Sequence, residues 1–353
     1  MTESSREAAE KAAGQPASES GERFLVVRLT ALGDILHTLP AVAALRAAHR
    51  AARIDWVVER KWAPGLEGSP ALDEVIPYER RSWWGAIECV QRLRSNRYTC
   101  AIDFQGLYKS SVLAALSGAP RRIGFDRAWA REPGAAMLYT RRVTPAGRHV
   151  AELNYSLAEA AGASRPPAPE YPLRVPAGGA ASIRARLQER SIGPYIVVAP
   201  AGSWGAKCWP PDRYGEFCRE FENRSPLRVV VIHGPGEKSI AEQVCRAAAP
   251  ARPEIVQTTI EELMGLLAHA KCLLAADSGP LHLAAALGTP VVGLYGPTDP
   301  ARNGPFVPGA IVITQARPDE ISYKRRTTFS PSMLRISVQQ VLAAVESALR
   351  PQA

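Results

Sequence analysis

The sequence predicts an α/β protein made of two Rossmann-like domains that face each other across a central cleft. Three observations support this fold class. Apolar segments typical of buried strands alternate with segments of helical spacing. The alternation occurs in both halves of the chain, on either side of a stretch rich in proline and glycine. In each half one apolar strand ends in a tight turn that leads into a helix, at residues 24–37 and 271–288.

The first half begins with the apolar strand FLVVRL, and an amphipathic helix then extends from the TALGD turn through Arg50. The remaining expected elements, in chain order, are strands at 54–59 and 74–78, a helix at 82–95, a strand at 98–104, a helix at 110–118, a strand at 121–125 and a helix at 149–162. Strands that alternate with helices predict a parallel sheet covered on both faces.

The second half repeats this pattern after the segment GASRPPAPEYPLRVPAGG, which is typical of an interdomain linker. The expected elements are helices at 182–190, 211–224, 260–270, 281–288 and 336–350, and strands at 195–201, 227–234, 271–277 and 290–296. We therefore divide the chain into a disordered tail at 1–22, a first domain at 23–170, a linker at 171–184, a second domain at 185–330 and a C-terminal helix at 331–353.

The composition fits a globular protein of the cytoplasm. Of the 353 residues, 46% are hydrophobic and 22% are charged. No run of apolar residues is long enough to predict a transmembrane helix, and the polar N-terminal tail lacks the apolar core of a secretory signal. The six cysteines are scattered without a CxxC pair. This spacing predicts free thiols in a reducing compartment, with neither a zinc site nor a disulfide framework.

The chain is basic, with a formal net charge of +9, and the excess lies in the first domain. The arginine clusters there are Arg80-Arg81, Arg121-Arg122, Arg127, Arg131, Arg141-Arg142 and Arg148. Such a field favours an anionic partner, which nucleic acid, an acidic glycolipid or an anionic membrane surface would each satisfy. Composition alone leaves a solvated basic face of no specific purpose equally open.

The turn of the second half has the features of a phosphate site. Asp277-Ser278-Gly279 ends the apolar strand, and a helix follows directly. The free N–H groups and the dipole at the helix N-terminus favour a phosphate, and His282 lies within the first turn. The alternative is that Asp277 only caps the helix and that His282 belongs to the core.

The turn of the first half contains a candidate base. Gly33 permits the sharp turn, and Asp34 is placed to project from the strand end towards the cleft. A simple N-cap role is the alternative for this aspartate. Neither GxGxxG nor a P-loop sequence occurs, but Lys207 follows another strand end and suits a diphosphate. Glu237 also follows a strand, where charge compensation at a helix N-terminus is the alternative role.

No Asp-x-Asp pair occurs in the chain. Many sugar transferases use such a pair to hold a divalent metal on a nucleotide diphosphate. Its absence predicts chemistry that requires no metal and no cofactor, with a helix N-terminus and Lys207 neutralising the diphosphate.

Taken together, these segments resemble one known family. The segments, in order, are GDILHTLP at 33–40, IDWVVE at 54–59, RRSWW at 80–84, IDFQGLYKS at 102–110, GFDRAWAREP at 124–133, KCWP at 207–210, DSGPLHLAAALGTP at 277–290 and YGPTDP at 295–300. From about Arg23 onward the chain resembles glycosyltransferase family 9, the heptosyltransferases of lipopolysaccharide core assembly, and the GLYK and AREP pieces are similar to its type I members.

The resemblance implies a GT-B fold with donor and acceptor on opposite domains. The donor would be ADP-L-glycero-β-D-manno-heptose on the second domain, and the acceptor would be the inner Kdo of Kdo2-lipid A on the basic first domain. The transfer would invert the anomeric centre and form an α-1,5 link. It also implies a cytoplasmic enzyme in peripheral contact with the inner membrane.

The resemblance also implies roles for individual residues. Asp34 matches the family's general base, and Lys207 matches the lysine that stabilises the departing ADP. The donor site would comprise Gly202, Ser203, Lys207, Glu237, Asp277, Ser278, Gly279 and His282. The acceptor site would comprise Arg80, Arg81, Lys109, Arg131 and His149, because arginine suits carboxylates and phosphates.

Three other functions stay open at this point. The chain could be a type II heptosyltransferase or another family 9 transferase, with the same chemistry on a different hydroxyl. It could be a two-domain sugar-binding protein without catalysis, which would need no base at Asp34. A nucleic-acid-binding protein is the third, and we expect no nucleic-acid partner because no helix-turn-helix or RNA-binding motif occurs.

Overall fold

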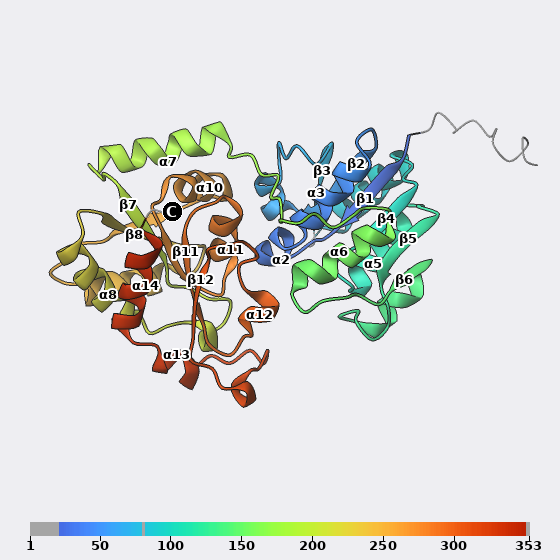
Figure 1. Cartoon of the computed structure of the whole chain (residues 1–353). Coiled ribbons are helices and arrows are strands. Elements are labelled where there is room, and N and C mark those ends of the chain that lie inside the picture. Colours follow the sequence, from blue (N-terminus) through green and yellow to red (C-terminus); the bar gives the residue numbers. More distant parts are fainter. Residues whose placement is uncertain (1–20, 80–81, 351–353) are drawn as a thin grey trace, which may run out of the picture.

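The computed structural model describes residues 21–79 and 82–350, which form two α/β lobes side by side (Figure 1). Each lobe is built on a six-stranded sheet whose strands are all parallel. The predicted fold class is confirmed. The apolar runs form the central strands because strands buried on both faces need side chains of that kind throughout.

The first sheet has the strand order β3-β2-β1-β4-β5-β6. Its strands are β1 (Arg23–Val27), β2 (Arg53–Glu59), β3 (Glu74–Tyr78), β4 (Cys100–Asp103), β5 (Arg121–Phe125) and β6 (Arg141–Val143). Its helices are α2 (Leu32–Leu36), α3 (Leu39–Ala48), α4 (Trp83–Ser95), α5 (Tyr108–Leu116) and α6 (Val150–Ala160). Helices α3 and α6 pack together, and α4 and α5 share a separate apolar cluster with the strands.

The second sheet has the order β12-β11-β10-β7-β8-β9. Its strands are β7 (Tyr195–Ala199), β8 (Arg228–His233), β9 (Glu254–Gln257), β10 (Leu273–Ala276), β11 (Val291–Tyr295) and β12 (Ile311–Thr314). Its helices are α7 (Ala177–Glu189), α8 (Pro211–Arg224), α9 (Lys238–Ala247), α10 (Ile260–His269), α11 (Gly279–Ala286), α12 (Pro300–Asn303), α13 (Pro331–Arg335) and α14 (Val338–Ala348). Short 3-10 turns are η1 (Arg60–Gly65), η2 (Pro133–Leu138), η3 (Gly205–Lys207) and η4 (Pro318–Glu320).

Several elements differ from the sequence-based expectation. Helix α7 begins at Ala177, inside the segment expected to be a linker, and two helices, α13 and α14, occupy the expected C-terminal helix. Helix α9 and strands β6, β9 and β12 were not expected. The three strands have three or four residues each and lie at or near sheet edges, so they lack the fully buried apolar run that identifies a central strand.

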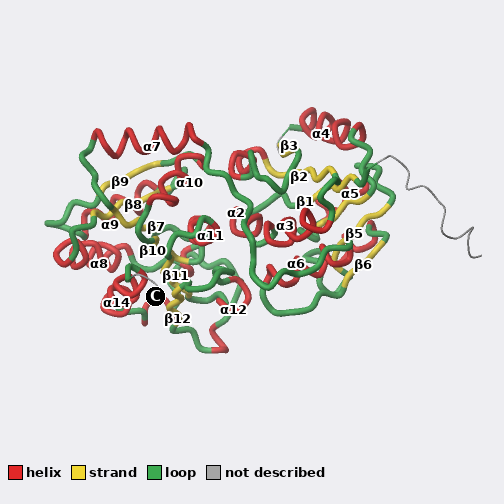
Figure 2. Tube along the Cα trace, turned by 45° about the horizontal axis from the view of Figure 1, so that its top comes forward, coloured by secondary structure: helices red, strands yellow, loops and turns green. Residues whose placement is uncertain are grey.

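The two lobes meet where α2 and α11 pack against each other, which both views show (Figures 1 and 2). Glycines permit this approach. A Cβ atom on Gly33 would lie 2.9 Å from Cδ2 of His282, and one on Gly279 would lie 2.9 Å from Cδ2 of Leu32. Both helices follow the carboxyl ends of central strands, so the contact joins the edges where open α/β sheets bind ligands.

Polar groups also join the lobes beside this contact. Arg148 donates to the carboxylate of Asp299 at 2.8 Å, and Nε2 of His149 lies 2.9 Å from the carbonyl oxygen of Gly304. The ring of His37 lies 4.4 Å from that of His282, between centroids. Burial, together with the neighbouring His282 and His149, lowers the pKa of His37 well below its ordinary value, so this contact forms with His37 neutral.

No helix among residues 21–79 and 82–350 is long and apolar enough to cross a bilayer.

Candidate active site

Asp34 lies in the first turn of α2, the helix that packs against α11 at the interface. The Leu29 N–H, just after β1, donates to Oε1 of Gln105 at 2.7 Å, and this hydrogen bond holds the turn that leads to α2. The N-cap residue is Ala31, which has no side-chain acceptor, and its N–H reaches Oδ2 of Asp34 only at 3.4 Å. The cap hydrogen bond to the Asp34 carboxylate is therefore weak, and the main partners of this carboxylate are charged side chains.

Two guanidinium groups hold Asp34. Arg28 lies 2.9 Å from Oδ1 and is itself almost fully buried, with a further hydrogen bond to the carbonyl oxygen of Phe104. Arg131 approaches Oδ2 at 3.5 Å and is about half exposed. Burial raises the pKa of Asp34, but Arg28 and Arg131 together outweigh burial and hold the pKa below its ordinary value. The carboxylate is therefore ionised at neutral pH.

A cavity of about 80 Å³ opens beside Asp34. Both lobes line it, because Arg302 and Asn303 of α12 complete a wall made otherwise by the first lobe. The remaining lining residues are Arg28, Phe104, Gln105, Phe125, Trp129, Arg131, Val150, Leu153 and Asn154. A reacting group held here would contact the Asp34 carboxylate and both domains at once.

The second charged cluster centres on Asp277, at the end of β10. Its Oδ2 accepts from Lys207 at 2.5 Å and from the Thr298 hydroxyl at 2.8 Å, and its Oδ1 lies 3.4 Å from Nε2 of His282. Burial raises the pKa of Asp277, but the hydrogen bond from His282 and the charge of Lys207 lower it to about 2. Asp277 thus fixes the lysine ammonium and the imidazole on one side of the α11 N-terminus.

The N-terminus of α11 carries an unused polar group. Ser278 is the N-cap residue, yet its hydroxyl caps nothing and has no partner although it is buried. The ammonium of Lys207 is nearby, bound to Asp277 and lying 4.1 Å from the centroid of the Trp204 ring. A helix N-terminus, a hydroxyl and an ammonium together form a site suited to a diphosphate.

Three further predicted donor residues lie on loops at the carboxyl edge of the second sheet. Gly202 and Ser203 follow β7, where the Gly202 N–H donates to Sγ of Cys208 at 3.2 Å. Glu237 precedes α9, and its carboxylate accepts from the Gly234 N–H at 2.8 Å, so it organises the turn after β8. The structure brings Lys207, Asp277, Ser278, Gly279 and His282 together.

The predicted acceptor residues are less closely grouped. Arg131 lines the cavity, whereas Lys109, at the start of α5, lies 3.6 Å from Glu59. His149 is buried, with Nδ1 accepting from the Ala151 N–H, Nε2 facing the Gly304 carbonyl and its ring stacked on Phe306. Arg80 and Arg81 lie outside the described residues. The acceptor roles stay predictions.

Sequence reasoning did not single out Arg28, Thr298 or Arg302. Thr298 stands in the YGPTDP segment, so the segment itself was a usable signal. Arg28 occurs inside the apolar strand FLVVRL, where a charge is unusual enough to mark a buried partner. Arg302 carries no such signal, because a lone arginine in a short surface helix is ordinary.

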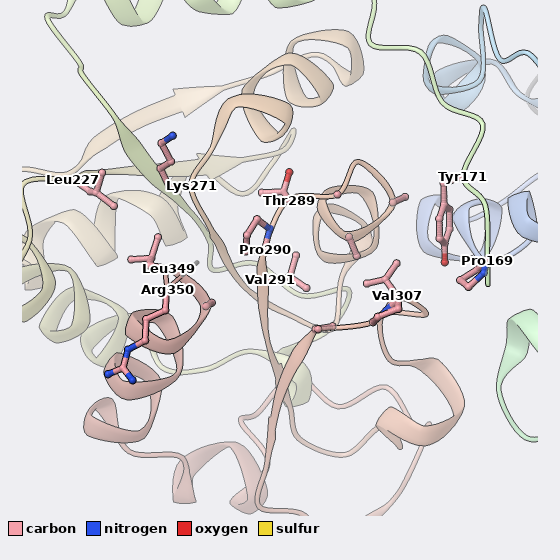
Figure 3. Close-up of a pocket in the computed structure, with 17 residues that line it drawn as sticks. Pro169, Tyr171, Leu227, Lys271, Thr289, Pro290, Val291, Val307, Leu349 and Arg350 are labelled. Atoms are coloured by element: carbon pink, nitrogen blue, oxygen red, sulfur yellow. The ribbon is translucent and has the colours of Figure 1, made fainter. Parts of the chain in front are cut away.

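A second cavity, of about 850 Å³, lies elsewhere (Figure 3). Thr289, Pro290 and Val291 line it at the amino end of β11, together with Tyr171 and Arg350. The described residues that line it include no Asp or Glu, and it lies at the edge of the sheet opposite to the one where open α/β sheets bind ligands. We therefore place the candidate active site at Asp34 and not in this cavity.

The described residues contain no group of three or more His, Cys, Asp and Glu side chains placed to hold a metal ion.

Comparison with known proteins gives one family. The model of "Glycosyltransferase family 9 (heptosyltransferase)" matches residues 87–332. The lipopolysaccharide heptosyltransferase 1 of Pseudomonas aeruginosa is 32% identical over 88% of each chain, and that of Escherichia coli is 30% identical over 85% of this chain and 96% of its own.

A solved structure agrees with these relatives. Escherichia coli heptosyltransferase WaaC with ADP superposes with a TM-score of 0.75 at 27% identity, covering 92% of this chain and 99% of its own. The same enzyme is also solved with ADP-2-deoxy-2-fluoro heptose. The expected GT-B architecture and the expected enzyme class are confirmed. The chain is a glycosyltransferase that belongs to family 9, the heptosyltransferases.

Proposed function

We propose that this enzyme transfers L-glycero-D-manno-heptose from ADP-heptose to the inner Kdo of Kdo2-lipid A, in the assembly of the lipopolysaccharide inner core. One observation carries the proposal. An ionised carboxylate, that of Asp34, and a diphosphate-type site, built from Lys207 and the α11 N-terminus, lie on the two sides of the α2–α11 contact. The relatives named lipopolysaccharide heptosyltransferase 1 support this choice of acceptor.

The proposed donor site is on the second lobe. The diphosphate of ADP-heptose would lie at the N-terminus of α11, near Ser278 and the Lys207 ammonium, with Gly202, Ser203 and Glu237 on the neighbouring loops. The WaaC structures, which contain ADP and an ADP-heptose analogue, support the choice of ligand. Lys207 and the helix dipole supply positive charge where a metal would otherwise be used, so the proposed reaction requires no metal.

The proposed reaction is a single inverting displacement. The Asp34 carboxylate takes the proton of the acceptor hydroxyl as that oxygen forms a bond to the heptose anomeric carbon. The bond from that carbon to the diphosphate oxygen breaks, and its electron pair leaves with ADP. Lys207 and the α11 dipole stabilise the charge that develops on the departing diphosphate.

The acceptor requires a membrane-facing surface, and the first lobe has suitable features. Its arginine excess favours anionic lipid, at about 1 kcal/mol for each basic side chain close to the surface. Trp83 and Trp84, at the start of α4, are exposed, and their ring centroids lie 3.8 Å apart. Tryptophan prefers the boundary between water and lipid. We propose peripheral contact with the cytoplasmic face of the inner membrane through this lobe.

The test is ADP release by the purified protein with ADP-heptose, with and without Kdo2-lipid A, in the presence of EDTA. The proposal expects release that depends on the acceptor and that EDTA leaves unchanged. Release with a Kdo2-lipid A that already carries the first heptose, and none with Kdo2-lipid A itself, would instead assign the chain to a type II reaction. Loss of activity in EDTA that added Mg²⁺ restores would contradict the metal-free chemistry.

A further inference from the structure

The cavity beside Asp34 carries an excess of positive charge. Its lining contains the guanidinium groups of Arg28, Arg131 and Arg302 and a single carboxylate, that of Asp34. The amide side chains of Gln105 and Asn154 add further polar groups to the lining. At about 80 Å³ it has room for a small anionic group. A cleft with this charge favours an anion.

Arg302 provides charge that no protein carboxylate in the described ranges neutralises by an ion pair. Its guanidinium lies 5.2 Å from the centroid of the Tyr323 ring and 3.4 Å from Oδ1 of Asn303. Arg148, at the same domain boundary, is paired instead, because Asp299 accepts from it at 2.8 Å. Arg302 also comes from the second lobe, opposite to Arg131, so a ligand bound by both would join the two domains.

Arg131 is the looser of the two partners of Asp34. It approaches the carboxylate at 3.5 Å with its side chain 55% exposed, whereas Arg28 approaches at 2.9 Å and is 4% exposed. A competing anion can therefore replace Asp34 as the ion-pair partner of Arg131, while Arg28 still holds the Asp34 carboxylate.

We propose that this cavity is the subsite for the carboxylate of the acceptor sugar, bound jointly by Arg131 and Arg302, and that its occupation releases Asp34 from Arg131. The identity of the acceptor rests on the proposed function. A planar carboxylate matches the fork of donors on each guanidinium. Arg131 is one of the charges that lower the pKa of Asp34, so its departure makes Asp34 a stronger base only when the acceptor is present.

The first test combines an enzyme variant with an altered substrate. We would measure kcat/KM for Kdo2-lipid A, and for an analogue whose Kdo carboxylates are converted to primary amides, with wild type and with Arg302→Gln. A hydrogen bond between charged groups predicts a loss of roughly 10- to 100-fold when wild type meets the amide. Arg302→Gln should show a comparable loss on the native acceptor and little further loss on the amide. Arg246→Gln, on an exposed face of α9, is the matched control and should behave as wild type.

The outcomes separate this inference from the proposed function. Wild type could transfer to Kdo2-lipid A while the ratio of kcat/KM for Kdo2-lipid A to kcat/KM for the amide analogue is the same in wild type and Arg302→Gln. That result would exclude the subsite and leave the proposed function standing. No transfer by wild type to Kdo2-lipid A would instead remove the proposed function. The KM for ADP-heptose should stay unchanged in Arg302→Gln, because the cavity lies on the acceptor side of Asp34.

The second test uses pH. The profile of kcat/KM reports the free enzyme, and the profile of kcat reports the substrate complex. In wild type the acid-limb pKa should be higher in kcat than in kcat/KM, because Arg131 has left Asp34 in the complex. In Arg131→Gln the two values should coincide. A wild-type enzyme with the same acid-limb pKa in both profiles would overturn the release of Asp34.

Discussion

At the scale of single residues, the carboxylates of Asp34 and Asp277 are ionised by different means and differ in their exposure, with side chains 18% and 6% exposed. Asp34 is held by two arginines, one buried and one half exposed, and faces a cavity. Asp277 is enclosed by Lys207, Thr298 and His282, so all its contacts are internal. The first carboxylate faces the cavity and suits the proton transfer that we propose for it. The second holds the cationic groups of the proposed donor site.

Replacing Asp34 with Asn should lower kcat by roughly 10²- to 10⁴-fold, because the proposed general base is lost. The dissociation constant for ADP-heptose, measured by calorimetry, should stay within about twofold of wild type, because the donor site is on the other lobe. The variant leaves Arg28 buried without a charged partner, so it should also unfold at a lower denaturant concentration. Glu67→Gln, an exposed carboxylate of the same lobe, is the control. An unchanged transfer rate in a folded Asp34→Asn enzyme would exclude this residue as the base.

Asp277 predicts how stability depends on pH. Its pKa is about 2 in the folded protein against an ordinary value of 3.8. A carboxyl group whose pKa is lowered by folding stabilises the folded state at any pH above its ordinary, unfolded pKa. This contribution is lost as the pH falls through the pKa of the folded state. We expect a loss on the order of 2 kcal/mol between about pH 4 and pH 2. Urea denaturation of wild type and Asp277→Asn across this pH range measures the loss. If the free energy of unfolding changed with pH equally in both proteins, the lowered pKa would not belong to Asp277.

At the scale of elements, the α2–α11 contact determines how close the two candidate clusters, around Asp34 and around Asp277, lie to each other. Each helix has a glycine in its first turn at the contact, Gly33 in α2 and Gly279 in α11, and His282 of α11 fills the space above Gly33. Because the ring of His282 also reaches Asp277, a shift of α11 relative to α2 would move the donor cluster together with the helix. The close approach of these helices is therefore part of the site.

Gly33→Ala tests this contact. The added Cβ would lie 2.9 Å from the His282 ring, a distance that the stiff imidazole can relieve only by moving. We expect kcat to fall by about tenfold or more, since a displacement of 1 Å at a reacting centre costs up to 10²-fold. Gly178→Ala in α7, where a Cβ meets nothing, is the matched control and should keep wild-type activity. Equal kcat values for Gly33→Ala and Gly178→Ala would show that catalysis does not need the close approach of α2 and α11.

The elements found and missed by sequence reasoning differ in burial. The central strands were expected because both their faces are apolar, as in LVV of β1 and VVV of β8. Strand β6 contains Arg141 and Arg142, both exposed, so nothing in its composition indicates a sheet. It forms because β5 provides the backbone partners, with Ile123 opposite Arg141. Pairing of this kind depends on a neighbour and not on local sequence.

At the scale of the whole molecule, charge and apolar exposure are divided between the lobes. The first lobe carries the arginine excess and the exposed Trp83 and Trp84, whereas the proposed donor site is on the second. This division suits an enzyme that receives one substrate from a membrane and the other from water. The contact between α2 and α11 brings the sites proposed for the two substrates together.

Vesicle co-sedimentation tests the membrane surface. Wild type should bind vesicles that contain anionic lipid at low salt and partly dissociate at high salt, because surface charges are screened. Replacing Trp83 and Trp84 with Ser should weaken binding by about tenfold or more, since one buried apolar side chain contributes roughly 1.5 kcal/mol or more. Leu334→Ser, an exposed apolar residue of the second lobe, should bind as wild type. Equal binding by the tryptophan variant would exclude this surface.

The sequence by itself determined the two parallel sheets, the turns at 30–34 and 277–279, and the family. Strand and helix periodicity are local, and the motifs are short, so each can be recognised without its spatial neighbours. Only the tertiary structure decided that Gly33 contacts His282, that Lys207 pairs with Asp277, and that Arg302 joins Arg131 at the Asp34 cavity. These groups stand far apart along the chain. They meet because each lies at the carboxyl edge of its sheet and because the two edges face one another, an arrangement that local periodicity does not encode.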